Sequence, residues 1–132
     1  MRGLIAGWGI GAGVAVALVD LVTRELARIT HEPDLATALD TLDLAANFGL
    51  FGWAGYRAAQ ALREFRPGLE AAVLAGVVTG VFAVVYNVVR YPDILTGSHV
   101  VQLMAWNIIY ASLGGVMGAW LGCRAGSRPP TG

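Results

Sequence analysis

The chain carries little charge and few reactive side chains. Only 14% of its 132 residues are charged, and all nine basic residues are arginine, whereas about 25% charged residues is usual for a soluble domain. The formal net charge is zero, so no basic field attracts nucleic acid. Cys123 is the single cysteine, which excludes an intrachain disulfide, a CxxC redox pair and a thiolate metal site.

Motifs that carry catalysis are also missing. The sequence has no Ser-His-Asp order, no glycine-rich phosphate loop and no HExxH helix. His31 and His99 stand in neither an HxxxH nor an ExxH spacing, so we interpret both as loop residues. Asp40 and Asp43 are close neighbours on one helix, whereas two acids that share a catalytic water usually come from two elements. We therefore expect no enzyme, no cofactor and no metal.

What the sequence has in abundance is apolar residues, which make up 56% of the chain. They form stretches of about 20 residues, the length needed to cross the ~30 Å hydrocarbon core of a bilayer. We predict an all-α membrane protein with four transmembrane helices, at about 3–28, 34–66, 69–90 and 99–123. A secretory signal peptide is an alternative for the first, with Arg2 before the apolar run and small residues at its end, but the run is long for that class.

Helix boundaries follow from prolines and one serine. Pro33 suits the first turn of a helix, and we expect that helix to continue to Pro67. Tyr91-Pro92 ends the next helix, because the residue before a proline disfavours α geometry. Ser98 is the predicted N-cap of the last helix. Residues 1–125 thus form one four-helix domain, and 126–132, with two prolines, are an expected disordered tail.

The second half of the chain resembles the first at a distance of 67 positions. Trp53 and Trp120, like Arg57 and Arg124, are separated by this offset. Asp20 falls on Asn87 in the same alignment, and Asp40 falls on Asn107. We predict two tandem helical hairpins, 1–66 and 67–125, as a parallel internal repeat with its axis along the membrane normal.

Arginines near the helix ends predict the orientation. Six lie on the side of the two termini and three on the other side. The positive-inside rule then places both termini in the cytoplasm, in the inner membrane of a bacterium. Trp53 and Trp120 with Arg57 and Arg124 are expected interface anchors, with aromatic rings at headgroup level and snorkelling guanidinium groups. A lipid or ligand site is the alternative reading of this Trp-x-Gly-x-Arg pattern.

Glycines recur at four-residue spacing in three of the predicted helices. Small residues four apart share a helix face and allow another backbone to approach closely. We predict that the row in the last helix packs against the first row in the first helix, and Gly9 and Gly13 form a second row there. The packing glycines are Gly3, Gly7, Gly11, Gly76, Gly80, Gly114, Gly118 and Gly122.

Polar side chains within the predicted spans gather in the half away from the termini. Asp43 and Asn107 lie deepest, and desolvation predicts that they point into the bundle, where hydrogen-bond partners are available. Interhelical hydrogen bonding and interfacial exposure are structural explanations, and a cation, proton or polar-ligand site is the functional one. The cluster comprises Asp20, Asp40, Asp43, Asn47, Asn87, Asn107 and Tyr110.

Two functions therefore remain open. The first is a structural or accessory subunit that packs beside other integral membrane proteins or self-associates through glycine faces. The second is a small transporter or channel for a cation, proton or polar solute. The small size of the chain and its scarcity of catalytic side chains favour the first function. The internal repeat and the intramembrane acids favour the second. The expected partners are the lipid bilayer and other membrane helices, with no nucleic acid.

Overall fold

The computed structural model describes residues 1–126 and forms four α-helices: α1 (Arg2–Thr30), α2 (Pro33–Leu62), α3 (Phe65–Arg90) and α4 (Gly97–Gly126). Their ends extend the predicted spans by a few residues, except at α2. The predicted tail begins at Gly126, which is helical. The rest of that predicted segment lies outside the described residues.

The turn between α2 and α3 differs from the prediction. The helix does not continue to Pro67 but ends at Leu62, where Arg63 adopts a left-handed conformation with φ of 55° and Glu64 is extended. Pro67 is the third residue of α3, and in a first turn the missing N–H has no intrahelical acceptor to lose. His31 and Glu32 make the same left-handed and extended pair between α1 and α2. Two-residue turns keep each pair of joined helices antiparallel and adjacent.

The N-terminus of α4 is capped by a neighbour of the predicted residue. The backbone N–H of His99 donates to the Thr96 hydroxyl oxygen at 3.3 Å, and the Thr96 and Ser98 hydroxyls are 2.9 Å apart. Thr96 therefore takes the capping role, because α4 begins at Gly97 and Ser98 is already inside it.

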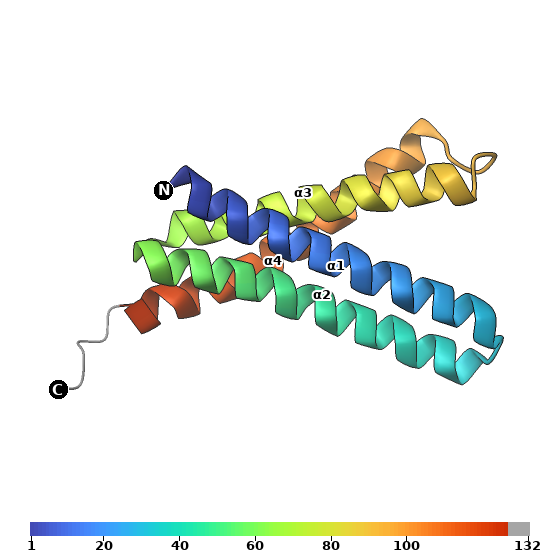
Figure 1. Cartoon of the computed structure of the whole chain (residues 1–132), viewed down its shortest axis with the longest axis horizontal. Coiled ribbons are helices and arrows are strands. Elements are labelled where there is room, and N and C mark those ends of the chain that lie inside the picture. The colour runs from blue at the N-terminus through green and yellow to red at the C-terminus, as the bar shows by residue number, and fades with distance from the viewer. Residues whose placement is uncertain (127–132) are drawn as a thin grey trace.

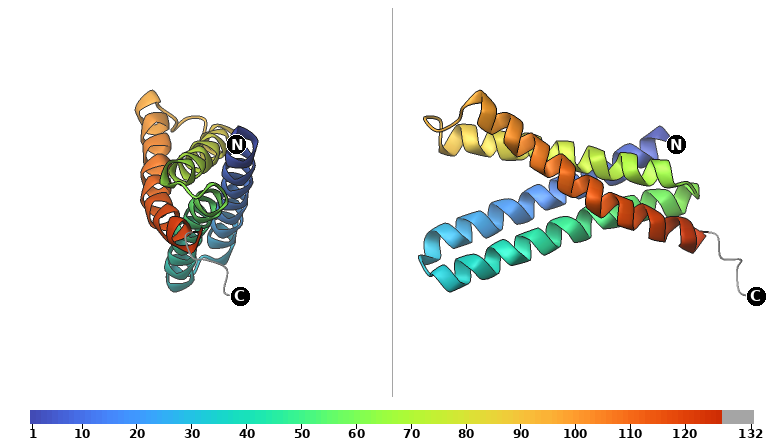
Figure 2. Two further views of the ribbon diagram at one scale, coloured as in Figure 1. Left: turned by 90° about the vertical axis from the view of Figure 1, so that its left-hand side faces the viewer. Right: turned by 180° about the vertical axis from the view of Figure 1, so that it is seen from behind.

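The two hairpins, α1–α2 and α3–α4, converge at the end that holds both chain ends and diverge at the other end (Figures 1 and 2). We call these the terminal end and the loop end. In the described chain α2 contacts α3, but α1 and α4 make no contact. A twofold axis that exchanged α1 with α3 and α2 with α4 would make these two pairs equivalent. The contacts therefore do not confirm the predicted symmetric repeat.

The interior is built from small side chains, and the large ones face outward. Most buried apolar residues are alanines, and the largest fully buried side chains are Phe51 and Val16. Leucines, valines, tryptophans and methionines are exposed along all four helices. Soluble proteins bury such residues, whereas helices in lipid gain their association from close backbone packing at small residues.

Helices α2 and α4 run in the same general direction, cross each other, and meet backbone to backbone (Figure 2). Carbonyl groups of Phe48, Gly52, Tyr56 and Gln60, each one turn further along α2, face glycines of α4. Any Cβ on these glycines would lie within 3.3 Å of a carbonyl oxygen, and at Gly118 it would overlap the carbonyl of Gly52. The geometry suits Cα–H···O contacts. The glycines in this row are Gly114, Gly118, Gly122 and Gly126.

The partner of this glycine row was predicted wrongly. We expected α1, at Gly3, Gly7 and Gly11, but a Cβ on any of these three would meet nothing within 4 Å. It is the second row of α1 that packs: Gly9 and Gly13 contact α3, and the Thr79 hydroxyl donates to the Gly13 carbonyl oxygen at 3.1 Å. Spacing alone identifies a close-packing face but not the helix that covers it.

The other predicted packing glycines lie between α3 and α4. Gly76 faces the backbone of Asn107 and the side chain of Ala111, and Gly80 faces Met104. A Cβ at Gly76 would lie 2.8 Å from the Asn107 carbonyl oxygen, whereas a Cβ at Gly80 would meet the flexible Met104 side chain. The glycines of α4 thus bring this helix close to α2, and the glycines of α3 bring it close to α3.

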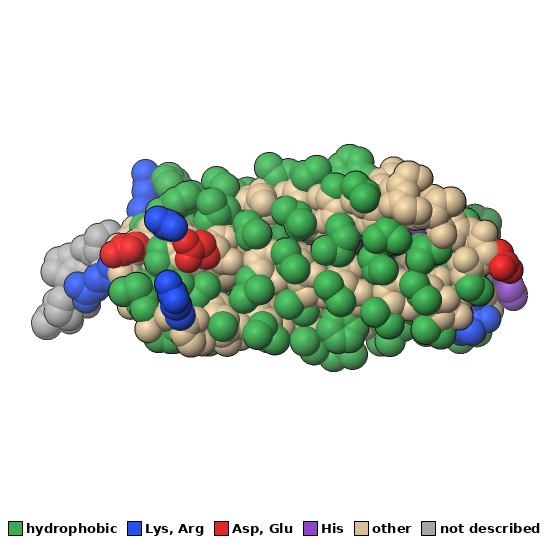
Figure 3. Space-filling model, turned by 90° about the horizontal axis from the view of Figure 1, so that it is seen from above, with side chains coloured by type: hydrophobic (Ala, Val, Ile, Leu, Met, Phe, Trp, Pro, Cys, Tyr) green, Lys and Arg blue, Asp and Glu red, His purple; other side chains and the backbone are tan. Residues whose placement is uncertain are grey.

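Three of the described helices, α1, α3 and α4, are long and apolar enough to cross a membrane. Charged side chains gather near both ends of the molecule, and an apolar belt lies between them on the face drawn in Figure 3. These features indicate a membrane protein with transmembrane helices. Helix α2 has the same length as α4, but Asp40, Asp43 and Arg57 interrupt its apolar sequence, so four spans are not confirmed.

Candidate functional site

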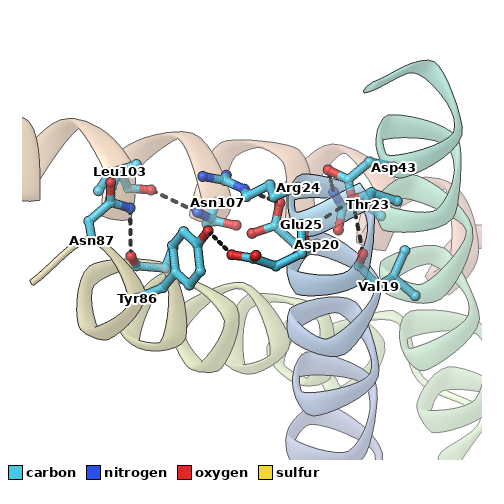
Figure 4. A network of polar contacts seen from close by, with 12 residues as sticks. Val19, Asp20, Thr23, Arg24, Glu25, Asp43, Tyr86, Asn87, Leu103 and Asn107 are labelled. Carbon is cyan, nitrogen blue, oxygen red and sulfur yellow. Dashed lines mark hydrogen bonds and ion pairs between the residues drawn. The ribbon is translucent and has the colours of Figure 1, made fainter. Parts of the chain in front are cut away.

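The densest group of polar side chains lies between α1 and α2, toward the loop end. Asp20 and Thr23, one turn apart on α1, face Asp43 of α2 (Figure 4), and Asp43 interacts with both. Asn47, one turn further along α2, donates from Nδ2 to Asp43 Oδ2 at 3.2 Å. Arg24 donates from Nε to Asp20 Oδ1 at 2.7 Å. Arg24 therefore pairs with Asp20, and only its charge acts on Asp43.

Two oxygen atoms of this group lack a protein donor. Oδ1 of Asp43 and Oδ1 of Asn47 are buried and accept no hydrogen bond. The Thr23 hydroxyl lies 2.9 Å from the Val19 carbonyl oxygen and 3.1 Å from that of Asp20, so backbone carbonyls of α1 compete for its single hydrogen. A buried acceptor without a donor costs about 1–3 kcal/mol. A proton, a cation or a water molecule would satisfy these oxygens, and this chemistry makes the group, which we call the Asp43 cluster, the candidate site.

The other predicted cluster residues lie elsewhere. Asp40 is exposed. Asn87 and Asn107 donate to carbonyl oxygens one turn back in their own helices, those of Ala83 and Leu103, at 2.8 and 2.9 Å. Tyr110 makes ring contacts with Phe48 and Trp106. The splay of the hairpins separates these residues of α3 and α4 from the Asp43 cluster, so the structure does not bring all seven residues of the predicted cluster together.

An ionic contact that the sequence did not reveal links the two hairpins. The Tyr86 hydroxyl donates to Glu25 Oε1 at 2.8 Å, and Arg90 reaches both oxygens of Glu25 at 3.2 Å. Arg28 donates to Glu25 Oε2 at 2.9 Å. Tyr86 and Arg90 are four residues apart and so share a face of α3. This spacing could have predicted that the two side chains lie together, but it does not identify Glu25 as their partner. One carboxylate on α1 therefore links α1 to α3, and Figure 4 shows the contact between Glu25 and Tyr86.

Replacing Glu25 with glutamine should lower the thermal unfolding temperature of the protein in detergent. The substitution removes the charge that binds two guanidinium groups and leaves the two hairpins without their ionic link. Glu70→Gln is the matched control. Among the described residues Glu70 pairs within α3, with an Arg66 side chain that is 87% exposed, and exposed pairs contribute little. Equal unfolding temperatures for Glu25→Gln and Glu70→Gln would contradict the proposed link.

A cavity of about 200 Å³ lies between α1 and α3, beside this ionic link. Its walls are mainly apolar, with Leu18 and Phe82 on opposite sides, and Asp20, Arg24 and Tyr86 supply its polar edge. The salt bridge between Asp20 and Arg24 therefore borders two features, the Asp43 cluster on one side and this cavity on the other.

At the terminal end, both predicted arginine anchors stack on tryptophans. The Arg57 guanidinium carbon lies 5.0 Å from the centroid of the Trp8 ring, and Trp8 packs edge-on against Trp53 at 4.9 Å. The Arg124 carbon lies 3.6 Å from the centroid of Trp120. Such cation–π contacts hold a guanidinium group in place at an apolar surface. Arg57 therefore stacks across the α1–α2 interface, whereas Arg124 stacks along α4.

Comparison of the chain with protein-family models, curated proteins and solved structures gives no match. Among residues 1–126, no three histidine, cysteine, aspartate or glutamate side chains lie together as a metal-binding group. The functional argument therefore rests on three features of the chain itself. These are the Asp43 cluster, the uncovered glycines of α1 and the arginines of the terminal end.

Proposed function

We propose that this protein is a non-catalytic component of a membrane assembly that packs against another transmembrane helix through α1. The helix belongs either to a larger integral membrane complex or to a second copy of this chain. In this proposal all four helices span the inner membrane as two tandem hairpins, and both termini are cytoplasmic. The hydropathy of α1, α3 and α4 and the excess of arginines at the terminal end support this placement.

The observation that carries the proposal is the open space at Gly3, Gly7 and Gly11. Glycine in a helix costs about 1 kcal/mol relative to alanine, so a row of glycines needs a reason. Elsewhere in this protein close helix packing explains the glycines. Gly9, Gly13 and Gly118, among others, lie so close to a neighbouring helix that a side chain would not fit. The row at Gly3, Gly7 and Gly11 has the same spacing and no neighbour among residues 1–126. A helix outside this chain supplies the missing contact.

Purification in a mild detergent tests this proposal. We expect a particle heavier than one 13.8 kDa chain, after the mass of bound detergent has been subtracted. A mass of twice that value identifies a second copy, and a stoichiometric larger protein identifies an accessory role. A purely monomeric particle that keeps its native stability would contradict the proposal.

A second candidate function, transport of a proton or cation, is supported by the unpaired oxygens of Asp43 and Asn47. Intramembrane acids are costly, and they often mark ion pathways. Against this reading, backbone contacts such as those between Gly52 and Gly118 close the bundle at the terminal end. A pathway would therefore need a second copy of the chain.

The substitution Asp43→Asn separates the two functions. Asparagine keeps one side-chain oxygen but removes the charge, so a transporter that uses Asp43 should lose ion flux while its yield and particle mass stay unchanged. Flux of protons and monovalent cations into proteoliposomes would measure this. Asp40→Asn is the matched control, because Asp40 is exposed and lies one turn away on the same helix. Flux that is equal in the wild type and both variants would end the transport reading.

A further inference from the structure

Acids balance the arginines at the loop end of the molecule but not at the terminal end. The loop-end arginines that form salt bridges are Arg24, Arg28 and Arg90. At the terminal end, one salt bridge joins Arg66 to Glu70. Among residues 1–126, three arginines of this end form no salt bridge: Arg2, Arg57 and Arg63. The terminal end therefore carries positive charge that its own acids do not balance.

One of these arginines, Arg57, is held against an aromatic surface that two helices build. Its guanidinium carbon lies 5.0 Å from the centroid of the Trp8 ring, and Trp8 packs edge-on against Trp53 at 4.9 Å. Arg57 is exposed, and so is Trp53. The guanidinium group makes no hydrogen bond or salt bridge within residues 1–126. Its N–H donors are therefore positioned by the ring contact and have no acceptor in the described chain.

This group lies at the depth of lipid headgroups. Arg57 is five residues before the end of α2 at Leu62, which is about 8 Å along a helix, and Trp8 lies in the second turn of α1. Tryptophans are enriched at the membrane–water interface, and an arginine side chain extends its charged end toward the headgroups. At this depth a membrane supplies phosphate groups, whose oxygens match the planar fork of N–H donors on a guanidinium group.

Charge then selects among phospholipids. Every phospholipid carries a phosphate, but a zwitterionic one also carries an ammonium group that needs an acid nearby. Within residues 1–126 the terminal end has one acid that forms no salt bridge, Glu64, against three such arginines. An excess of arginine near a membrane surface attracts lipids with a net negative charge.

We propose that Arg57, held over Trp8, binds the phosphate of an anionic phospholipid that lies against the exposed ring of Trp53. The lipid reading of the Trp-x-Gly-x-Arg pattern thus applies to Trp53 and Arg57. The site is separate from the uncovered glycines of α1, because Trp8 contacts α2 whereas Gly7 has no neighbour among residues 1–126. Gly7→Leu, which should abolish the assembly, should therefore leave lipid binding intact.

Native mass spectrometry of the purified full chain tests the site. The probes are phosphatidylglycerol and phosphatidylcholine with identical acyl chains, supplied in equal amounts. We expect phosphatidylglycerol to be retained about fivefold more, which corresponds to about 1 kcal/mol and is the size expected for one arginine at an anionic surface. Arg57→Gln should reduce this preference to near one. Arg66→Gln, the matched control, removes the same charge from the same end but from a salt bridge, and it should keep the preference.

A change at Trp8 separates a positioned guanidinium group from a free positive charge. Trp8→Leu keeps Arg57 but removes the ring beneath it, so the preference should fall toward one. Trp8→Phe keeps an aromatic face and should retain most of the preference. Helical content and unfolding temperature, measured for each variant, exclude misfolding as the cause of a lost preference.

Four results would overturn the proposal. The first is equal retention of the two lipids by the wild type, and the second is an unchanged preference in Arg57→Gln. The third is an equal loss in Arg57→Gln and Arg66→Gln, which would mean a general effect of charge. The fourth concerns the source of the phosphate: glycerol phosphate, which lacks acyl chains, should not displace the lipid at equal concentration. Displacement would identify a site for a soluble anion.

Discussion

Replacing Gly118 with alanine should destabilise the folded bundle by about 3 kcal/mol, near the upper end of the usual range for overpacking. The added Cβ would overlap the carbonyl group of Gly52. This carbonyl belongs to the backbone of α2 and cannot rotate away as a side chain could. The two helices would therefore have to separate along the whole row of contacts from Gly114 to Gly122. Thermal unfolding in detergent, followed by circular dichroism, measures the loss.

Gly49→Ala is the control for this prediction. Gly49 lies inside α2, but a Cβ there would meet nothing within 4 Å. Alanine is the better helix former by about 1 kcal/mol, so this variant should match or exceed the stability of the wild type. If Gly118→Ala proved as stable as Gly49→Ala, the close packing of α2 on α4 would be wrong.

Replacing Gly7 with leucine should separate the protein from its partner while leaving the protein itself folded. The new side chain extends into open space, and leucine raises helix propensity relative to glycine, so the isolated chain should not lose stability. Another helix, however, could no longer approach α1 closely. We expect the particle mass in mild detergent to fall to that of a single chain.

Gly49→Leu controls for the added apolar bulk. It places the same side chain at another uncovered helical glycine, one that is outside the α1 row. This variant should keep the mass of the wild-type assembly. Loss of assembly in both variants would indicate a general effect of leucine in detergent, and persistence in both would mean that the α1 row is not an interface.

The helices could be predicted from sequence because their signals are local. Apolar length and the breaks at Pro33 and Pro92 located all four helices. The turn at Arg63 and Glu64 was missed, since a proline in the first turn of a helix costs no hydrogen bond and Pro67 therefore did not mark the boundary. The left-handed conformation of Arg63 could not be predicted from sequence, because glycine is the usual residue at such a position.

Pairings between helices were harder to predict, since they depend on which faces meet. The glycines of α4 were recognised as a packing face, but their partner is α2, where the matching surface is a row of backbone carbonyls. Carbonyls occur at every residue and leave no sequence signal. Gly3, Gly7 and Gly11 looked like a match because they had the same spacing.

The Asp43 cluster was predicted in part for a similar reason. Asp20, Asp43 and Asn47 meet because α1 and α2 are joined by a short turn, so residues at similar distances from it lie close together. Asn87 and Asn107 did not join them, because each amide finds an acceptor on its own helix. Thr23 was overlooked although it lies three residues after Asp20 and shares its face.

Photo-crosslinking in intact membranes tests the central claim most directly. A photoreactive residue at Ile10, which is 49% exposed beside the glycine row, should form a discrete protein adduct, and Gly7→Leu should abolish it. The same group at Val101, which is 67% exposed on α4, should label only lipid. If Ile10 also labelled only lipid, or if its protein adduct persisted in Gly7→Leu, the proposed assembly through α1 would be contradicted.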